Sequence, residues 1–244
     1  MLDADQSMTE HPTAVVVGAG GIGSALCRFW HEECGYRVVA ISRRPDSHAT
    51  VDWRVTDYSE DSLRAIVESL QQQNVALDRL VITNGFLSRD GFSPERKMAD
   101  LDAKKLEEVL AVNSILPAMV LKAFWPLLRA SESPRIAVLS ARVGSIEDNR
   151  LGGWYAYRAS KAALNMLLRT ASIELKRLNR RAKLIAYHPG TVDTALSKPF
   201  QRNVPSEQLL TPEFAARRLH EVLLEIDGAG ELSYLDWRGD NIPW

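Results

Sequence analysis

The sequence contains little cysteine and no excess of charge. Its 244 residues include two cysteines, Cys27 and Cys34, whose spacing matches no common zinc or redox motif. We therefore expect reduced thiols and no metal site. The sequence has 30 Lys and Arg residues and 31 Asp and Glu residues, which gives a net charge of -1. This balance gives no sign of a nucleic-acid or membrane-surface partner.

The sequence also lacks a long uninterrupted apolar run and a leader-like N-terminus. Residues 1–13 are polar and acidic, without the basic and apolar stretches of a secretory signal. We predict a cytoplasmic protein without a membrane span, and a flexible tail over residues 1–12. No repeat, low-complexity tract or linker follows, so residues 13–244 are predicted to form one domain.

Short apolar runs alternate with segments of helical spacing along the chain. We predict strands at residues 13–17, 36–41, 80–83, 135–139, 183–187 and 231–235. We predict helices at residues 22–33, 59–72, 103–129, 154–178 and 212–226, with Pro117 and Pro126 bending or interrupting the third. This alternation is typical of an α/β protein with a Rossmann-like, doubly wound parallel sheet and helices on both faces.

A glycine cluster follows the first predicted strand. Gly18, Gly20 and Gly23 form the pattern G-x-G-x-x-G before a helix, with Gly21 and Ile22 inside it. Such glycines permit a tight turn, close approach of the backbone to a pyrophosphate, and close packing of the helix on the strand. Helix N-termini also attract phosphate. The pattern predicts a dinucleotide site, and the alternative is a glycine turn that binds no ligand.

The end of the second predicted strand bears on the choice of dinucleotide. Proteins that bind NAD place an acidic residue there, which bonds the ribose 2′-hydroxyl. This chain has Arg43 and Arg44 instead. A guanidinium is a good partner for a 2′-phosphate. The sequence favours NADP(H), with NAD(H) as a possible cofactor; the alternative is that both arginines are solvated surface charges.

A tyrosine and a lysine lie one helical turn apart in the fourth predicted helix. Tyr157 and Lys161 share a helix face, so both side chains can point at one cleft. A fixed cation favours phenolate and lowers the pKa of tyrosine toward the working range. The pair alone also fits an exposed lysine beside a half-buried core tyrosine. The dinucleotide pattern upstream favours a reaction centre.

Taken in order, these motifs resemble the short-chain dehydrogenase/reductase family over essentially the whole chain. A narrower likeness, strongest in residues 140–165, is to the branch that includes the C-factor signalling proteins and the carbonyl reductase sniffer. The resemblance implies an NAD(P)-dependent oxidoreductase that transfers hydride between nicotinamide and a small carbonyl or alcohol. The segments that carry it are 18–23, 84–85, 111–113, the Ser140 region, 157–161 and 189–194.

The resemblance also implies residue roles. Tyr157 would be the general acid–base, Lys161 would bind the nicotinamide ribose and lower the pKa of the tyrosine, and Asn113 would hold a water of a proton relay. The adenosine side of the cofactor would contact Asn84, Gly85 and Asp57. The segment that lines the nicotinamide would comprise Pro189, Gly190, Thr191, Val192 and Thr194.

The resemblance further implies a homodimer or homotetramer assembled through the helix at residues 154–178. The alternative is a monomer whose loops cover that helix. Trp154 and Tyr155 precede the tyrosine, and with Phe200 they form either a wall of the substrate pocket or part of the core. The sequence leaves both interpretations open and does not identify the substrate.

One departure from the family concerns its catalytic serine. The serine position is occupied by Ala141, and Ser140 precedes it. A shift of one residue in a strand moves a side chain to the other face. We expect the Ser140 hydroxyl to replace that of the catalytic serine, with Ser145 as the alternative. If neither hydroxyl does so, a rival hypothesis gains support, namely a dinucleotide-binding signalling or regulatory protein with weak or no catalysis.

Overall fold

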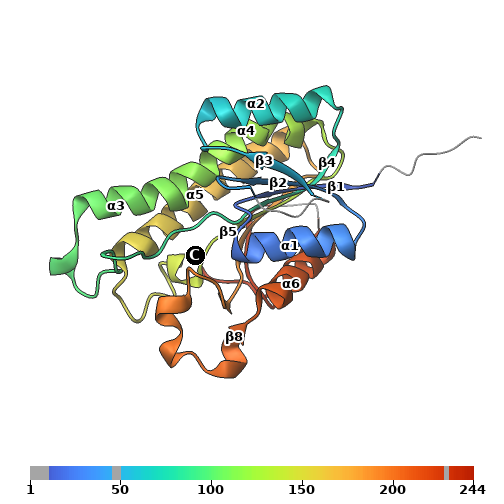
Figure 1. Cartoon of the computed structure of the whole chain (residues 1–244). Coiled ribbons are helices and arrows are strands. Elements are labelled where there is room, and N and C mark those ends of the chain that lie inside the picture. The colour runs from blue at the N-terminus through green and yellow to red at the C-terminus, as the bar shows by residue number, and fades with distance from the viewer. Residues whose placement is uncertain (1–10, 46–50, 228–230) are drawn as a thin grey trace, which may run out of the picture.

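A parallel sheet forms the centre of the protein (Figure 1). The computed structural model describes residues 11–45, 51–227 and 231–244, so the predicted tail lies almost wholly outside the described residues. Within these ranges the sheet has the strand order β3-β2-β1-β4-β5-β6-β9, with every neighbouring pair parallel. The strands are β1 (Thr13–Val17), β2 (Arg37–Ser42), β3 (Asp52–Val55), β4 (Leu77–Ile82), β5 (Arg135–Leu139), β6 (Lys183–His188) and β9 (Ser233–Asp236).

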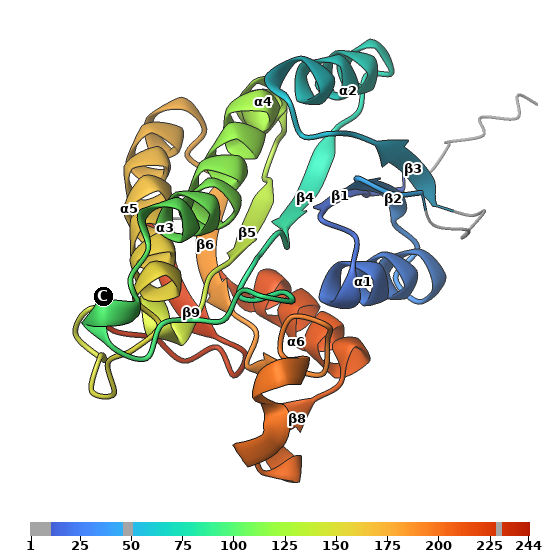
Figure 2. The same cartoon turned by 60° about the vertical axis from the view of Figure 1, so that its left-hand side comes forward.

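Helices cover both faces of this sheet (Figure 2). One face carries α1 (Gly21–Glu32) and α6 (Pro212–Glu225), and the other carries α2 (Glu60–Gln72), α4 (Leu116–Ala130) and α5 (Tyr155–Leu178). The strands are buried on both sides, because Val15 and Val17 of β1 join one apolar cluster while Ala14 and Val16 join the other. The predicted doubly wound α/β fold is confirmed.

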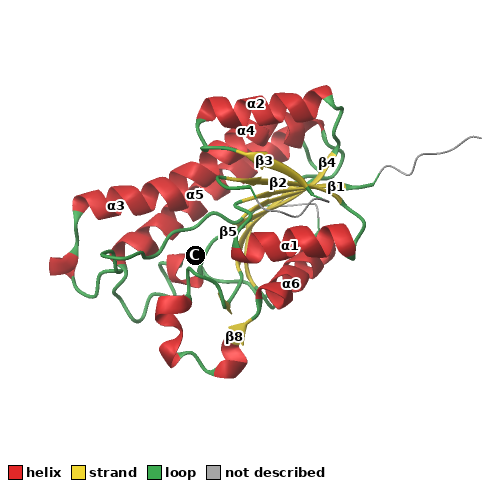
Figure 3. Ribbon diagram, viewed as in Figure 1, coloured by secondary structure: helices red, strands yellow, loops and turns green. Residues whose placement is uncertain are grey.

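Three short strands were not predicted from the sequence. The edge strand β3 carries Asp52 and Arg54, which pair with each other at 2.7 Å and break the apolar pattern of a buried strand. The strands β7 (Thr191–Val192) and β8 (Leu209–Leu210) pair with each other and have two residues each. Figure 3 shows β8 apart from the central sheet, beside the short helical turns that follow β7.

The third predicted helix is longer and less interrupted than expected. It runs from α3 (Ala103–Leu110) through a π-helical turn (Ala111–Ile115) into α4. Pro117 lies in the first turn of α4, where its missing N–H is tolerated, and Pro126 lies within α4 without ending it. An interruption is therefore present at the π-helical turn just before Pro117, whereas the interruption expected at Pro126 is absent from α4.

This continuous stretch, Ala103–Ala130, is also the one helix in the described part of the chain that is long and apolar enough to cross a membrane. The sequence prediction that no apolar run approaches that length is therefore corrected. Core helices of globular proteins pass the same test. Here α4 packs against α2 and α5, and five of its apolar side chains belong to the core, namely Val120, Leu121, Phe124, Leu127 and Leu128.

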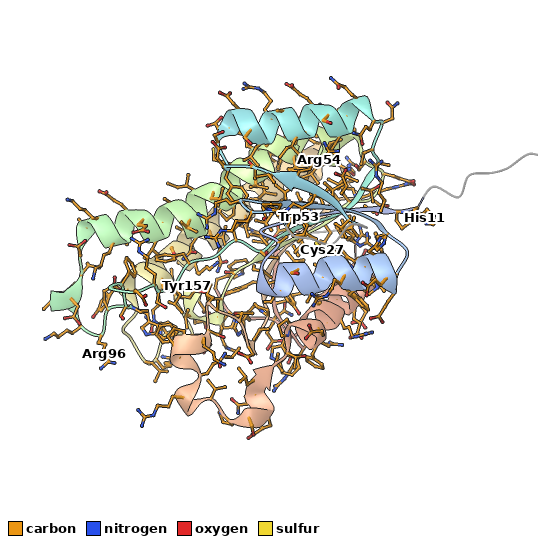
Figure 4. All side chains as sticks on the ribbon, in the orientation of Figure 1. His11, Cys27, Trp53, Arg54, Arg96 and Tyr157 are labelled. Carbon is orange, nitrogen blue, oxygen red and sulfur yellow. The ribbon has the colours of Figure 1, made fainter. Side chains whose placement is uncertain are left out.

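The parallel strands bring their carboxyl ends to one edge of the sheet. The strand order reverses between β1 and β4, and ligands of such sheets bind in the crevice at this point. The loops after β1, β4, β5 and β6 all begin at this edge, and they contain most of the predicted site residues. In Figure 4 Tyr157 lies toward this edge, whereas His11, which precedes β1, lies at the opposite one.

Candidate active site

The glycine turn after β1 is tightly packed against the end of β4. Gly18 has φ +92°, and a Cβ added there would lie 2.8 Å from Thr83 Oγ1. A Cβ at Gly23 would lie 2.6 Å from the Gly18 carbonyl oxygen, so only glycine fits without displacement of the backbone. The Thr83 hydroxyl donates a hydrogen bond to the Gly18 carbonyl oxygen. Packing thus accounts for two glycines of the motif.

The remaining parts of the turn fit a dinucleotide. A Cβ at Gly20 would meet no atom within 4 Å, so this backbone borders open space at the N-terminus of α1. Among the described side chains, none caps this helix end. Asn84 lies against Gly18, and its Oδ1 is buried without a hydrogen-bond partner within the described residues. An open helix N-terminus and an orphaned polar atom are what a bound phosphate and nucleoside would satisfy.

The turn that carries the two arginines is held in place by neighbouring residues. The Ser42 hydroxyl donates to the Arg44 carbonyl oxygen at 2.6 Å and accepts from the Arg44 N–H at 3.1 Å. The indole N–H of Trp53 donates to the same carbonyl oxygen at 2.9 Å. Arg43 and Arg44 are exposed at the end of β2. Both guanidinium groups are therefore accessible to an anionic ligand.

Asp57, which is predicted to lie on the adenosine side of the cofactor, follows β3. Its side chain is exposed, and its carboxylate accepts a hydrogen bond from the Ser59 N–H at 2.9 Å. Hydrogen bonds from the side chain and backbone of Ser59 lower the pKa of this carboxyl group. The carboxylate is thus fixed at the start of α2.

The structure brings Tyr157 and Lys161 together in the first turns of α5. Both side chains are buried, with 9% and 2% of their surface exposed. The Lys161 ammonium lies 5.9 Å from the centroid of the Tyr157 ring and donates a hydrogen bond to the Leu139 carbonyl oxygen at 2.8 Å. The end of β5 therefore aligns the lysine behind the tyrosine.

Asn113 lies in the π-helical turn, fully buried. Its carboxamide accepts from the Phe86 N–H at 2.7 Å and donates to the Phe86 carbonyl oxygen at 2.8 Å and to Ser160 Oγ at 3.0 Å. Pro117 has no N–H to offer the Asn113 carbonyl, four residues earlier in the chain. The side chain therefore joins the loop after β4 to α5.

The segment after β6 returns to the glycine turn. Thr194 contacts Gly21, since a Cβ there would lie 2.9 Å from Thr194 Cγ2. Gly190 has φ +80°, and a Cβ there would clash with Leu210 and Trp237. Val192 is buried in β7. The predicted nicotinamide segment, which begins at Pro189, thus lies beside the predicted pyrophosphate turn.

Aromatic side chains pack near Tyr157. Trp154 meets the Tyr157 ring edge-on, with centroids 6.1 Å apart, and meets the Phe200 ring at 5.1 Å. The apolar side chains packed around Tyr157 also include Leu87, Ala141, Val143 and Leu196. We call these seven residues, namely Tyr157, Trp154, Phe200 and the four just named, the apolar cluster. Tyr155, which was grouped with Trp154 from the sequence, begins α5 and does not belong to the cluster as described.

Comparison with protein families decides the assignment. Residues 12–205 match the model of the family described as short chain dehydrogenase. The chain belongs to this family. It is accordingly an NAD(P)-dependent oxidoreductase of the short-chain dehydrogenase/reductase type, as the sequence resemblance implied.

Two relatives with assigned names locate the chain within the family. It is 31% identical to the 1-hydroxy-2-glutathionyl-2-methyl-3-butene dehydrogenase of Rhodococcus sp. (strain AD45), over 85% of this chain and 88% of that one. It is also 31% identical to the C-signal protein of Myxococcus xanthus, over 60% of this chain and 83% of that one. The second match confirms the predicted likeness to the C-factor branch.

Two solved structures share the fold. The carbonyl reductase Sniffer of D. melanogaster is similar with a TM-score of 0.80 and 20% identity, over 96% of this chain and all of that one. The NADPH-bound carbonyl reductase from chicken fatty liver is similar with a TM-score of 0.78 and 24% identity, over the same shares of the two chains. These similarities show that the fold is that of the short-chain dehydrogenases.

The electrostatics of the pair in this short-chain dehydrogenase differ from the expectation. Burial raises the pKa of Tyr157, with a smaller contribution from Tyr234, whereas the lysine was expected to lower it. Burial also lowers the pKa of Lys161 from 10.5 to about 7. Both groups are removed from water, so the neutral form of each is favoured. The phenol therefore keeps its proton at neutral pH and can donate it.

The serine prediction requires a correction. Ser140 Oγ donates to Asn165 Oδ1 at 2.7 Å, inside the layer beneath the site. Ser145 Oγ donates to the Trp244 carbonyl oxygen at 3.3 Å and accepts from the Asp148 N–H at 3.0 Å. Ala141 is the residue that packs against Tyr157. Side chains of adjacent extended residues alternate, so Ser140 points away and the family's serine position carries a methyl group.

Sequence reasoning missed several residues of the site. Leu87 and Leu196 belong to loops whose apolar residues carry no periodic signal, so only the fold places them beside Tyr157. Tyr234, from β9, donates to the Ala141 carbonyl oxygen at 2.5 Å and fixes the backbone under the site. In the described ranges, no group of three or more His, Cys, Asp or Glu side chains is placed to hold a metal ion.

His188 ends β6 beside this site. Its Nδ1 is buried without a partner among the described residues. Burial, with smaller contributions from nearby charges, lowers its pKa to about 4. The imidazole is therefore neutral at physiological pH and offers no positive charge to the site.

Proposed function

We propose that this short-chain dehydrogenase is an NADP(H)-dependent reductase of small aldehydes and ketones, or a dehydrogenase of the corresponding alcohols, with Tyr157 as general acid–base. The observation that carries the proposal is the buried Tyr157–Lys161 pair at the carboxyl edge of the sheet, beside an open glycine turn. The direct test is NADPH oxidation by the purified protein in the presence of a panel of carbonyl compounds.

The residues divide the reaction between them. The nicotinamide, when bound, would supply the hydride in reduction and accept it in oxidation. The Tyr157 hydroxyl donates its proton to the carbonyl oxygen, and in oxidation it takes the proton back. Lys161 holds a ribose hydroxyl behind the phenol, while the backbone carbonyl of Asn113 holds the water that resupplies the proton. The apolar cluster keeps bulk water away from these groups.

The cofactor would lie across the switch-point crevice. Its pyrophosphate would contact the turn at the N-terminus of α1, and its nicotinamide would contact the segment after β6. The proposed pyrophosphate residues are Gly18, Gly20, Gly21, Ile22 and Gly23; the adenosine residues are Asp57, Asn84 and Gly85; the nicotinamide residues are Pro189, Gly190, Val192 and Thr194. The contacts between Gly18 and Asn84 and between Gly21 and Thr194 support this placement.

The preference for NADP(H) is tested by removal of the two arginines. We expect Arg43→Ala with Arg44→Ala to raise the Kd of NADPH by about 10- to 100-fold, because each guanidinium supplies charge-assisted hydrogen bonds to the 2′-phosphate. The Kd of NADH is expected to change by less than about twofold. Titration calorimetry measures both. Arg64→Ala, on the surface of α2, is the control. Tighter binding of NADH than NADPH by the wild type would contradict the preference and leave NAD(H) as the cofactor.

The second candidate function is a dinucleotide-binding signalling or regulatory protein with weak or no catalysis. The observation that favours it is the methyl group of Ala141 at the serine position, with Ser140 and Ser145 bonded elsewhere. The similarity to the C-signal protein adds support.

The variant Ala141→Ser distinguishes the two functions. If the protein is a reductase that lacks one hydrogen bond to the carbonyl oxygen, the added hydroxyl should raise kcat by about tenfold, with an unchanged Kd for NADPH. Steady-state kinetics and calorimetry measure the two quantities. Ala159→Ser, exposed on the same helix as Tyr157, is the matched control. Absence of turnover in both the wild type and Ala141→Ser, despite tight NADPH binding, would favour the regulatory function.

We further propose a cytoplasmic homodimer or homotetramer in which residues 13–244 of each chain form one domain. The outer face of α5 supports the assembly, since Met166, Leu167 and Ile173 are exposed there, Met166 to 67%. An apolar helix face of this kind is stabilised by contact with a second copy. The two apolar clusters that sandwich one sheet support the single domain.

A further inference from the structure

The turn that precedes α5 has an unusual backbone. Gly152, Gly153 and Trp154 have φ values of +64°, +65° and +53°, three left-handed residues in succession. Glycine adopts this region freely, but a bulky side chain rarely does. A residue held in such a conformation is a reason to look for function, because the surrounding structure must maintain it.

Hydrogen bonds from two directions hold this turn. The Trp154 N–H donates to the Glu95 carbonyl oxygen at 2.6 Å. The Arg158 guanidinium donates to the carbonyl oxygens of Gly153 at 3.0 Å, Gly152 at 3.1 Å and Val143 at 3.3 Å. The backbone from which the Trp154 indole projects is thus held on both sides.

The held indole faces the reaction centre. It meets Tyr157 edge-on and meets Phe200 at 5.1 Å with the ring planes 60° apart. Phe200 belongs to the 3₁₀ turn Lys198–Asn203, a segment far from α5 in the sequence. Both rings are half-buried, whereas core aromatics such as Trp30 and Phe124 are fully buried. Two partly exposed rings beside the general acid are placed as a binding surface rather than as core.

We propose that Trp154 and Phe200 form an aromatic clamp for a ring attached to the carbonyl carbon of the substrate, so that the substrate class is uncharged aryl ketones and aryl aldehydes. The inference rests on the proposed function, since it concerns the same site. The two rings contact each other at 5.1 Å, so a third ring would pack against their exposed side, where it gains from edge and offset contacts that a saturated ring of equal size does not offer. The apolar side chains Leu87, Ala141, Val143 and Leu196 offer no partner to a charged group, and an unpaired charge there is strongly disfavoured.

Binding of matched probes to the NADP⁺-loaded protein tests the clamp without requiring turnover. The probes are acetophenone, cyclohexyl methyl ketone of similar size, and pyruvate, each titrated by calorimetry. We expect acetophenone to bind about five- to tenfold more tightly than the cyclohexyl ketone, and pyruvate to bind least. Trp154→Ala should weaken acetophenone binding by about tenfold or more and remove its advantage over the cyclohexyl ketone, with Trp154→Phe in between. Phe200→Ala should act in the same direction.

The control is Phe29→Ala, which removes another half-buried ring. Phe29 lies on α1, and its ring contacts that of His220 on α6. It should leave the three affinities unchanged. Equal binding of both neutral ketones, equal weakening of both by Trp154→Ala, or preferred binding of pyruvate would each overturn the clamp. So would the absence of acetophenone binding to the NADP⁺-loaded protein.

Failure of the clamp and failure of the proposed function have different signatures. Tyr157→Phe should keep the advantage of acetophenone over the cyclohexyl ketone, because the ring contacts remain and both ketones lose the same hydrogen bond. If acetophenone binds through Trp154 but NADPH is never oxidised, the reductase function fails and the clamp stands. If NADPH is oxidised with aliphatic or anionic carbonyls in preference to aryl ones, the clamp fails and the reductase function stands.

Discussion

Tyr157→Phe is expected to lower kcat for carbonyl reduction by a factor on the order of 10³, while the Kd of NADPH stays within about twofold of the wild type. The substitution removes only the hydroxyl, which is the proposed proton donor, and keeps the ring that packs with Trp154 and Ala141. Single-turnover kinetics with NADPH in excess would measure the chemical step, and calorimetry the affinity.

Tyr155→Phe is the matched control, since it removes the same atom two residues away. Its kcat should equal that of the wild type. Turnover retained by Tyr157→Phe would remove the tyrosine from the role of general acid. A parallel loss of NADPH affinity would instead indicate that the hydroxyl holds the cofactor rather than the reacting carbonyl.

Lys161→Met is expected to stabilise the unliganded protein while it abolishes turnover. Burial lowers the pKa of Lys161 to about 7, well below the 10.5 of an unfolded lysine. At neutral pH, folding therefore costs free energy, because it moves a side chain that is charged in the unfolded chain out of water. Methionine has a similar length and carries no charge. We expect the free energy of unfolding at pH 7 to rise by on the order of 3 kcal/mol. The loss of the hydrogen bond from Lys161 to the Leu139 carbonyl oxygen reduces this gain.

The stability gained by Lys161→Met should depend on pH. Between about pH 7 and pH 10.5 the unfolded chain binds a proton at Lys161 that the folded chain has released, so the wild type gains stability as the pH rises. The advantage of Lys161→Met should therefore be largest at or below pH 7 and should vanish near pH 10.5. Urea unfolding across this range measures it.

Lys176→Met, exposed on the same helix, is the control and should change the stability by less than about 0.5 kcal/mol. A Lys161→Met protein that is less stable than the wild type at pH 7 would contradict the cost assigned to burial. An advantage that does not vary with pH would indicate that packing, rather than charge, is the cause.

The fold and much of the site follow from local patterns in the sequence. The apolar run Thr13–Val17 before Gly18 predicts a strand that is buried on both sides and ends in a tight turn, which is what the structure has. The spacing of Tyr157 and Lys161 determines that they share a face of α5, and helical geometry alone brings them to one cleft. These features depend on neighbours in the chain, which is why they could be predicted.

The parts that could not be predicted depend on contacts between distant segments. Whether Ser140 or Ala141 points toward Tyr157 depends on where β5 ends relative to α5, which spacing along the sequence does not determine. The expected lowering of the tyrosine pKa was derived from the lysine charge alone. It failed because burial, which only the packed structure reveals, acts on both groups. The Trp154 turn likewise requires Glu95, from a loop far upstream.

The carboxamide of Asn113 has a consequence for how substrate reaches the site. It hydrogen-bonds the N–H and the carbonyl oxygen of Phe86 as well as Ser160, and it thereby joins the loop after β4 to the helix that carries Tyr157. We therefore expect substrate to enter beside the segment that carries Phe200, which reaches the glycine turn through the contact of Thr194 with Gly21. Entry on that side would leave the loop after β4 and the helix of Tyr157 joined during substrate binding and product release.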